Sequence, residues 1–385
     1  MNTTENDTKK TILVTGSGGM IGWHLSVFLD AKPDTVNLIR CDRAGFNDDT
    51  FLSDAISKSD VVVHLAGMNR GDEEEIVAAN IGMADRLIDL CRQAEATPQI
   101  IYSSSTHADG PTRYGYSKRT AGEHFEAWAT GTGAKFCNLV LPHVFGELGK
   151  PFYNSVVSTF ASQIVNGESP TVTGDGDLNL LHSHEVSKII WDKIETGFSG
   201  TYRPEGQPIK VSQLLERLQT LWARYQVGVM PNFDDLFDVR LFNVMRSYLD
   251  HEKRPIDLTL HEDNRGDLFE AVRADGRGQV FVSTTEPGIT RGNHFHFKKV
   301  ERFLVFSGKA KIRLRRVLTD EIFTYEVSGK QLQAIDIPTL HTHNITNVGD
   351  EPLLTLFWTN EHYDPADSDT FFLPVEPAEP ASTEA

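Results

Sequence analysis

Two different patterns of hydrophobic residues follow one another in this chain, and they restrict its fold more than any other feature. In the first, the short apolar runs 11–15, 61–65 and 99–103 alternate with stretches of helical spacing such as 75–92. Strands that alternate with helices predict a parallel sheet with helices on both faces. The sequence therefore predicts an α/β domain with a doubly wound parallel sheet over residues 11–250, mostly helical after about residue 150.

The second pattern begins after about residue 254, where short runs suited to β-strands alternate with turns. These runs cover residues 279–284, 301–306, 309–317, 322–327, 333–337 and 353–358. In residues 309–315, charged and apolar side chains alternate, as expected for a strand with one buried face. The spacing predicts an all-β sandwich or barrel over residues 251–374. Residues 1–10 and the acidic tail 375–385 are expected to be flexible.

The composition excludes several classes of partner. The 385 residues include 37 Lys and Arg but 54 Asp and Glu, which gives a net charge of −17. Such a chain repels phosphate backbones and anionic lipid, so we expect neither a nucleic-acid nor a membrane partner. Three cysteines are too few for a disulfide framework, and no apolar run reaches the ~18 residues of a membrane span. These properties predict a cytoplasmic protein.

A glycine-rich turn follows the first predicted strand and precedes a helix. It places glycine at every third position, at Gly16, Gly19 and Gly22, with Met20 and Ile21 between the last two. Glycine permits the tight turn and the close approach of backbone to a diphosphate, whose charge then lies at the helix N-terminus. The turn therefore predicts a dinucleotide site.

Two further segments bear on which dinucleotide binds. The second predicted strand, 35–41, is followed by Asp42 and Arg43. An acidic residue there binds the ribose 2′-hydroxyl of NAD, whereas an arginine pairs with the 2′-phosphate of NADP. The sequence has both, and we favour NADP(H) over NAD(H). Three residues at the end of a later strand are expected beside the cofactor: Leu65, Ala66 and Gly67.

A tyrosine and a lysine lie four residues apart at the start of a predicted helix. This spacing puts Tyr114 and Lys118 on one helical face. A lysine cation beside a phenol lowers the pKa of the phenol, and a nearby hydroxyl can share the carbonyl oxygen of a substrate. The serines at 103–105 close a strand and offer such a hydroxyl. Tyr114 is thus a candidate acid for ketone reduction, with Lys118 holding the nicotinamide ribose.

Together these residues resemble the extended short-chain dehydrogenase/reductase family, which has a Rossmann-type fold. The resemblance covers about residues 10–250 and also includes His64 and Asn80. It implies a nucleotide-sugar substrate and assigns the catalytic hydroxyl to Ser105, with Ser104 as the alternative. One segment departs from the family, because residues 140–146 lack the arginine three positions before an asparagine that many relatives have.

Three histidines and one glutamate in the β-rich segment have the spacing of a metal site. His294 and His296 are two residues apart and share a strand face, Glu301 opens the next apolar run, and His343 comes from a distant segment. Neutral imidazoles with a carboxylate suit a divalent metal that keeps an open coordination position. The order of these residues matches both motifs of the cupin family, which the segment resembles, although Leu340 stands where glycine is usual.

A polar stretch precedes this metal motif. Residues 263–270 read Asp-Asn-Arg-Gly-Asp-Leu-Phe-Glu and resemble a segment near the start of sugar-epimerase cupins. The guanidinium of Arg265 is therefore a candidate to bind a phosphate or a sugar oxygen of the substrate.

Over nearly its full length, the chain resembles the bifunctional enzymes of UDP-N-acetyl-L-fucosamine synthesis, which act in bacterial capsule and O-antigen pathways. The match includes residues 64–70, 288–294 and 150–155, with Asn154 as a candidate substrate contact. The resemblance implies a homodimer with a jelly-roll cupin barrel that holds zinc. The implied substrate is a UDP-linked 4-keto-6-deoxy amino sugar. The cupin would epimerise C3, and the N-terminal domain would reduce the C4 ketone with NADPH to the L-talose product.

Several alternatives stay open. The base for epimerisation could be Lys298, Lys299 or His341. The N-terminal domain could instead be a nucleotide-sugar 4-epimerase or dehydratase, with the cupin as a binding or dimerisation module. A dehydratase is expected to have an acidic residue where Thr106 follows Ser105. The other alternative is a metal oxygenase fused to a dehydrogenase.

Overall fold

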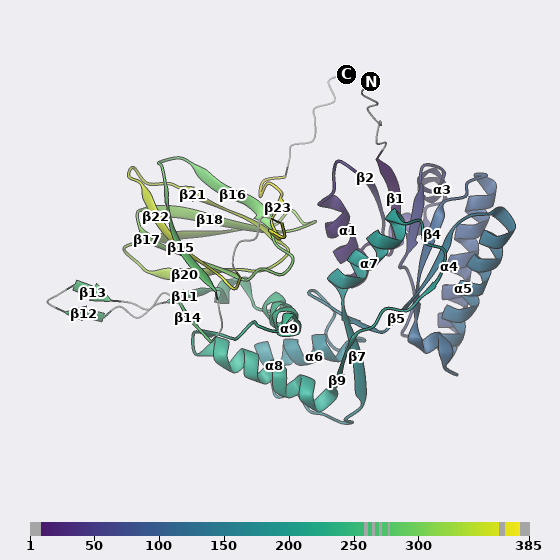
Figure 1. The fold of residues 1–385 in the computed structure, drawn as a ribbon, viewed down its shortest axis with the longest axis horizontal. Helices are drawn as coiled ribbons and strands as arrows, with labels where there is room; N and C mark the ends of the chain where they lie inside the picture. The colour runs from purple at the N-terminus through teal and green to yellow at the C-terminus, as the bar shows by residue number, and fades with distance from the viewer. Residues whose placement is uncertain are drawn as a thin grey trace, which may run out of the picture. The chain divides into compact units, whose positions relative to one another are not determined.

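The computed structural model of the chain describes residues 9–257, 261–263, 266–268, 272–275, 278–361 and 366–377 (Figure 1). The chain divides into two compact units, which are described separately. The first unit comprises Met1–Gly149 and Gly176–Lys210, and the second comprises Lys150–Asp175 and Val211–Ala385. The second unit thus includes segments before residue 250 that the sequence grouped with the N-terminal domain. The functional boundary near residue 250 stays a prediction.

A six-stranded sheet forms the centre of the first unit. Its strands run in the order β2-β1-β3-β4-β5-β8, and every neighbouring pair is parallel. They are β1 (Lys10–Thr15), β2 (Val36–Cys41), β3 (Val61–His64), β4 (Gln99–Ser105), β5 (Phe136–Leu141) and β8 (Gly200–Tyr202). The predicted parallel sheet is therefore confirmed, and the strands expected at 11–15, 61–65 and 99–103 are β1, β3 and β4.

Helices cover both faces of this sheet (Figure 1). One face carries α1 (Met20–Asp30) and α7 (Ser183–Glu195), and the other carries α3 (Asp49–Ser57), α4 (Glu73–Gln93) and α5 (Arg113–Thr132). The short helix α2 (Arg43–Asn47) follows β2, and a 3-10 helix (Thr106–Asp109) follows β4. Helix α4 confirms the helical spacing predicted for residues 75–92.

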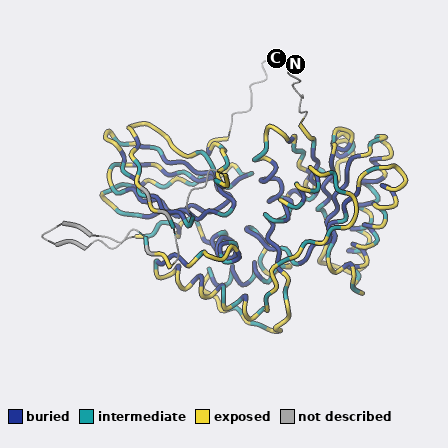
Figure 2. The backbone as a smooth tube through the Cα atoms, in the orientation of Figure 1, coloured by how far each residue is buried: buried dark blue, intermediate teal, exposed yellow. Residues whose placement is uncertain are grey.

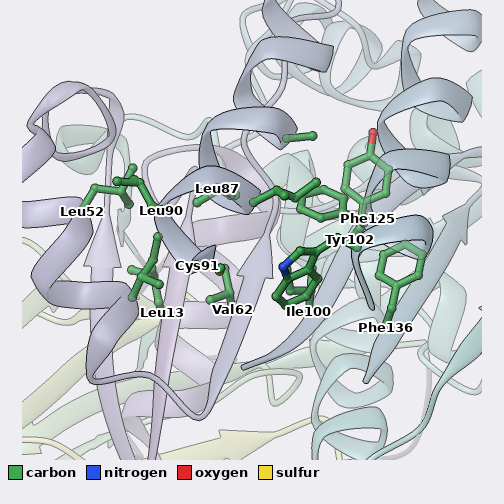
Figure 3. Close-up of a cluster of buried hydrophobic side chains, with 14 of the residues drawn as sticks. Leu13, Leu52, Val62, Leu87, Leu90, Cys91, Ile100, Tyr102, Phe125 and Phe136 are labelled. Carbon is green, nitrogen blue, oxygen red and sulfur yellow. The ribbon is translucent and has the colours of Figure 1, made fainter. Parts of the chain in front are cut away.

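A hydrophobic core lies between the sheet and the α3–α5 face (Figure 3). Leu13, Val62 and Ile100 come from neighbouring strands and are buried against Leu87 of α4 and Phe125 of α5. Each such side chain contributes about 1.5–3 kcal/mol on full burial. Central strands of a parallel sheet are covered on both faces, which is why they read as continuous apolar runs in the sequence.

A three-stranded sheet completes the first unit. Strand β6 (His143–Phe145) pairs in parallel with β7 (Asp177–His182), which pairs antiparallel with β9 (Gln207–Lys210). The segment after residue 150, expected to be mostly helical, also contains β7, β8, β9 and the two-residue strand β10 (Val229–Met230). These strands are short and have few consecutive apolar residues, so they leave no apolar run in the sequence.

Three helices of the second unit pack against one another: α6 (Val156–Val165), α8 (Val211–Gln226) and α9 (Leu236–Ser247). The 3-10 helix His251–Lys253 follows α9. Helix α8 buries one face whose members recur at helical spacing, namely Leu214, Leu218, Leu221, Trp222 and Tyr225. This amphipathic helix agrees with the helical content expected after about residue 150.

Two five-stranded antiparallel sheets lie in the second unit, with the orders β11-β20-β17-β22-β15 and β19-β18-β21-β16-β23 (Figure 1). Their strands are β11 (Pro255–Asp257), β15 (Gln279–Thr285), β16 (Thr290–Phe295), β17 (Glu301–Ser307), β18 (Lys309–Arg316), β19 (Ile322–Ser328), β20 (Gln333–Ile337), β21 (His341–Asn347), β22 (Leu353–Thr359) and β23 (Phe371–Phe372). Two further pairs are β10 (Val229–Met230) with β14 (Arg273–Ala274), and β12 (His261–Asp263) with β13 (Gly266–Leu268). Buried segments run through the middle of the large sheets (Figure 2).

The hydrophobic pattern located six of these strands, which are β15, β17, β18, β19, β20 and β22. The predicted alternation along residues 309–315 is confirmed at the start of β18, where exposed lysines alternate with buried Ala310 and Ile312. The pattern missed β16 and β21. Both strands consist largely of polar residues, so they contain no apolar run, although their backbones pair along most of their length.

In the described part of the chain, no helix is long and apolar enough to cross a membrane. The predicted flexible ends are described only in part. Lys10 opens β1, and the carbonyl of buried Val375 accepts a hydrogen bond from Nε of Arg315 at 2.6 Å. Residues 1–8 and 378–385 lie outside the described residues.

Candidate functional site

The glycine turn lies where the strand order of the parallel sheet reverses. Strand β1 has β2 on one side and β3 on the other, and such a position at the carboxyl ends of strands is where open α/β sheets bind ligands. Gly16 has a φ of +72°, and a Cβ there would lie 2.6 Å from the backbone nitrogen of Ala66, just after β3. Only glycine permits both the conformation and this close approach.

Helix α1 begins directly at this turn. Gly19 is its N-cap residue and offers no side chain to the first amide groups of the helix, which has no acidic residue in its first turn. Met20 and Ile21 are the first two helical residues. A helix N-terminus without a side-chain cap keeps N–H donors and positive partial charge available for an anion. This arrangement suits the diphosphate of a dinucleotide.

At the end of β2, Asp42 and Arg43, which bear on the choice of dinucleotide, have different surroundings. Asp42 is the N-cap of α2, and its carboxylate accepts a hydrogen bond from the amide of Gly45 at 2.9 Å. Arg43 is the first residue of α2 and is exposed, whereas Arg40 pairs with Asp30 on α1. The carboxylate is thus engaged in helix capping, while the guanidinium of Arg43 is accessible.

The residues after β3 are fixed by a buried asparagine, Asn80 of α4. Its Oδ1 accepts from the amide of Met68 at 2.7 Å, and its Nδ2 donates to the Met68 carbonyl and to Oγ of Ser117. A Cβ at Gly67 would lie 3.6 Å from Nζ of Lys118. The segment Leu65–Gly67 is therefore held against α5, next to the lysine of the predicted pair.

Tyr114 and Lys118 lie in the first two turns of α5, as their spacing predicted. Lys118 is only 5% exposed, and burial lowers the pKa of its ammonium group to about 8. Burial also raises the pKa of the Tyr114 phenol. The pKa of the phenol thus lies above its ordinary value, and a lowering of it by Lys118 stays a prediction.

Ser105 ends β4, and its hydroxyl accepts a hydrogen bond from the amide of His107 at 3.2 Å, whereas Ser104 is buried in the strand. The imidazole of His107 lies edge-on to the Tyr114 ring, with 6.1 Å between centroids. Burial and the charge of His107 both lower the pKa of His143 at the start of β6. Sequence reasoning missed both histidines, although His143 stands in the segment that departs from the family pattern.

Sequence reasoning also missed a buried carboxylate close to α1, the helix that begins at the glycine turn. Glu147 lies with Oε2 3.2 Å from Nε2 of His182 and 3.6 Å from Nε2 of His24 on α1. Burial alone would raise the pKa of Glu147, but the neighbouring imidazoles lower it to about 2. This cluster ties the segment after β6 to α1. No sequence motif marks it, because its three members are far apart in the chain.

The four predicted metal ligands come together in the second unit. His294 of β16 is the register partner of His343 on β21, and Nε2 of His296 and of His343 lie 3.0 and 3.3 Å from Oε2 of Glu301. One donor atom from each residue lies within 4.8 Å of the other three. Ligands at ~2.1 Å from a tetrahedral ion lie roughly 3.4 Å apart, so these side chains fit a divalent metal.

Backbone groups orient the imidazoles of this cluster. Nδ1 of His296 bonds the carbonyl of Asp369 at 2.6 Å, and Nδ1 of His343 bonds the carbonyl of His341 at 3.3 Å. A ring that donates from Nδ1 presents the lone pair of Nε2, which is the form that binds a metal. Burial and the other two histidines lower the pKa of His294 to about 3, so it is neutral. Asp369 was missed because it lies far along the chain.

The candidate bases have different surroundings. Nζ of Lys298 lies 2.8 Å from a carboxylate oxygen of Asp367, and Nζ of Lys299 donates to the carbonyl of Ser368 at 2.9 Å. His341 is buried and bonds the Thr339 carbonyl through Nδ1 at 3.0 Å. Both lysine ammonium groups are thus engaged within the described part of the chain.

Of the two residues predicted to bind the substrate, the structure describes only Asn154. Asn154 is exposed and lies just before Ser155, the N-cap of α6, in the second unit. Arg265 lies outside the described residues.

Comparison with known proteins defines a class for each part of the chain. Residues 12–201 match the family described as NAD dependent epimerase/dehydratase family, and residues 261–371 match the family described as Polysaccharide biosynthesis C-terminal domain. The predicted combination of an epimerase/reductase-type domain with a separate C-terminal domain is therefore confirmed.

One full-length match narrows this class. The crystal structure of capsular polysaccharide assembling protein CapF from Staphylococcus aureus is 33% identical to this chain, covers 95% of it and 100% of the other chain, and has a TM-score of 0.62. The chain belongs to the family of this CapF protein.

Two sequence relatives agree with this placement. The UDP-2-acetamido-2,6-beta-L-arabino-hexul-4-ose reductase of Pseudomonas aeruginosa is 29% identical over 366 residues, which are 94% of this chain and 97% of the relative. The probable low-salt glycan biosynthesis epimerase Agl13 of Haloferax volcanii is 27% identical over 138 residues, 33% of this chain and 88% of the relative.

Proposed function

We propose that this chain is a bifunctional nucleotide-sugar enzyme of capsular polysaccharide synthesis, with a ketone reductase in the first unit and a C3 epimerase in the second. The observation that carries the proposal is that one chain holds two polar clusters of different chemistry. Tyr114 and buried Lys118 suit ketone reduction, whereas the cluster around Glu301 suits a metal. The Pseudomonas relative, named for reduction of a UDP-linked hexul-4-ose, supports the proposed ketone reductase.

For the first unit we propose NADP(H) as the cofactor. Gly16, Gly19, Met20 and Ile21 would hold its diphosphate at the N-terminus of α1. The capping role of Asp42 and the exposed position of Arg43 favour a 2′-phosphate over a free 2′-hydroxyl. The bound dinucleotide supplies the hydride for C4 of the sugar.

The protein side chains would handle the charge that forms on the C4 oxygen. Tyr114 would donate its proton to this oxygen, and its raised pKa keeps it protonated before the reaction. Ser105 would donate a hydrogen bond to the same oxygen. Lys118, held beside Leu65–Gly67, would bind the nicotinamide ribose and place a positive charge near the reacting atoms.

For the second unit we propose a cupin barrel that holds one zinc ion through His294, His296, Glu301 and His343. When bound, the metal supplies positive charge near the substrate oxygens. The proton at C3 is acidic because C3 is next to the C4 ketone. A base would remove it and a proton would return on the opposite face, which inverts C3. Reduction of the ketone would then prevent the reverse reaction and fix the L-talose configuration.

The test is incubation of the protein with UDP-2-acetamido-2,6-dideoxy-4-hexuloses and NADPH or NADH in D2O, followed by NMR of the products. We expect deuterium at C3 and one NADPH consumed per product. Turnover without net NADPH consumption would instead favour a 4-epimerase or dehydratase. Light scattering tests the proposed homodimer, which should have twice the 43.0 kDa of one chain.

A matched pair of variants separates the two steps. Tyr114→Phe should abolish NADPH oxidation and leave deuterium exchange at C3 intact. Tyr116→Phe is the control, because Tyr116 lies on the same helix but is 41% exposed, and it should retain both activities. If folded Tyr114→Phe also lost the exchange, the division of labour between the two units would be wrong.

A further inference from the structure

A cluster of buried arginines in the second unit has no role in the proposed reaction. Arg246 of α9, Arg254 after the 3-10 helix and Arg302 of β17 are each 1% exposed. They surround Asp336 of β20, which is fully buried, and Tyr225 of α8. We call these five residues the arginine cluster.

The one carboxylate of the arginine cluster is already paired. Nε and Nη2 of Arg302 donate to the two carboxylate oxygens of Asp336 at 2.7 and 3.2 Å, and the hydroxyl of Tyr225 donates to the same carboxylate. Burial and Asp336 raise the pKa of Tyr225, so the phenol is neutral. The charges of Arg246 and Arg254 are therefore not balanced within the cluster.

The hydrogen bonds of these two arginines are also incomplete. Arg246 donates from Nη2 to the Ile337 carbonyl at 2.9 Å, and Arg254 donates from Nη2 to the Leu249 carbonyl at 3.1 Å. Within the described residues, Nε and Nη1 of Arg246 and Nη1 of Arg254 are buried with no hydrogen-bond partner. Burial and Arg246 lower the pKa of Arg254 only to about 10, so its guanidinium remains a cation at neutral pH.

We propose that the arginine cluster encloses a small inorganic anion, of the size of chloride, bound between Arg246 and Arg254. A buried cation without a counter-charge is strongly unfavourable, and a neutral water molecule would satisfy the donors but not the charge. The donors have almost no exposed surface, which favours a monatomic anion over a phosphate ester that must reach solvent. The anion would strengthen the link between α9 and β20, where Arg246 already donates to the Ile337 carbonyl.

The first test uses the unmodified protein and halide salts. At constant ionic strength, replacement of sodium gluconate by chloride should raise the Tm by roughly 2–5 °C for each tenfold increase above the dissociation constant. Crystals soaked in bromide should give an anomalous peak between the guanidinium groups of Arg246 and Arg254. No chloride-dependent shift together with no bromide peak would overturn the proposal and leave buried water as the partner. Stabilisation by sulfate but not by chloride would overturn the assignment of size.

A matched pair of variants distinguishes this site from a general salt effect. Arg246→Met keeps the length of the side chain and removes the charge, so it should lose the chloride dependence of the Tm. Arg217→Met is the control, because Arg217 is on the neighbouring α8, is partly exposed and pairs with Asp235. It should keep the full chloride dependence. Equal chloride dependence in both variants would overturn the proposal, and the bromide experiment decides if Arg246→Met does not fold.

Discussion

Gly18 and Gly22 of the glycine turn allow a sharp test of its geometry, because they lie close together in sequence but in different surroundings. A Cβ at Gly22 would lie 2.2 Å from the Gly16 carbonyl oxygen and 2.8 Å from Cα of Ser17, and both are backbone atoms. A Cβ at Gly18 would have no heavy atom within 4 Å. Gly22→Ala should therefore force the turn and α1 apart, whereas Gly18→Ala should fit the folded protein.

The expected magnitude follows from this distance. To reach a normal separation from the Gly16 oxygen, the new methyl group must move by about 1 Å, and overpacking of this kind costs about 1–3 kcal/mol. Gly22 lies in the first turn of α1, where alanine is the better helix former by up to about 1 kcal/mol. The net loss of stability should be about 1–2 kcal/mol, or roughly 2–8 °C in Tm for a unit of this size.

Thermal unfolding and NADPH titration of both variants measure these effects. An N-terminus of α1 displaced by about 1 Å misdirects its amide donors, so Gly22→Ala should weaken NADPH binding by roughly 10–100-fold. The free energy of unfolding of Gly18→Ala should stay within about 0.5 kcal/mol of the original protein. If Gly22→Ala had the same Tm and the same NADPH affinity as the original protein, the close approach of the turn to the helix would be refuted.

Three further predictions concern the metal cluster around Glu301 and the buried Lys118. His294→Ala combined with His343→Ala should remove the bound metal, as measured by elemental analysis; retained stoichiometric metal would contradict the ligand assignment. Asp369→Ala should weaken metal affinity by about 10–100-fold in competition with a chelator, because the Asp369 carboxylate accepts hydrogen bonds from the amides of Lys298 and Lys299 and so holds in place the backbone carbonyl that bonds His296; an unchanged affinity would exclude this role. Lys118→Met should stabilise the cofactor-free protein at pH 7 by about 1–3 kcal/mol in urea unfolding, because burial lowers the pKa of Lys118 from 10.5 to about 8. The unfolded chain binds the extra proton between these two pKa values, so this advantage should shrink as the pH rises from 8 to 10.5; a constant difference would refute the cause.

The sequence by itself determined the features that depend on residues close together in the chain. The order of strand, glycine turn and helix around Gly16 is visible because apolar runs and glycines have local meanings. Tyr114 and Lys118 share a helix face because of their spacing alone. The β-rich C-terminal segment was recognisable from its alternating runs, and the four metal ligands from their order along it.

The tertiary structure decided which distant residues meet. Gly16 is constrained by Ala66 because β1 and β3 are neighbours, and His294 meets His343 because β16 pairs with β21 in one register. The hydrophobic pattern missed both of these polar strands, since their pairing is made by backbone hydrogen bonds that do not require apolar side chains. Asp369 supports the metal cluster from a segment 73 residues beyond His296.

Burial also decided properties that no local pattern contains. The pKa of Tyr114 rises because the folded protein removes water from the phenol. Likewise, Arg246 and Arg254 are ordinary charged residues in the sequence. They become an unbalanced buried pair only in the folded second unit. Solvent exclusion depends on the whole fold, which is why these two outcomes required the three-dimensional structure.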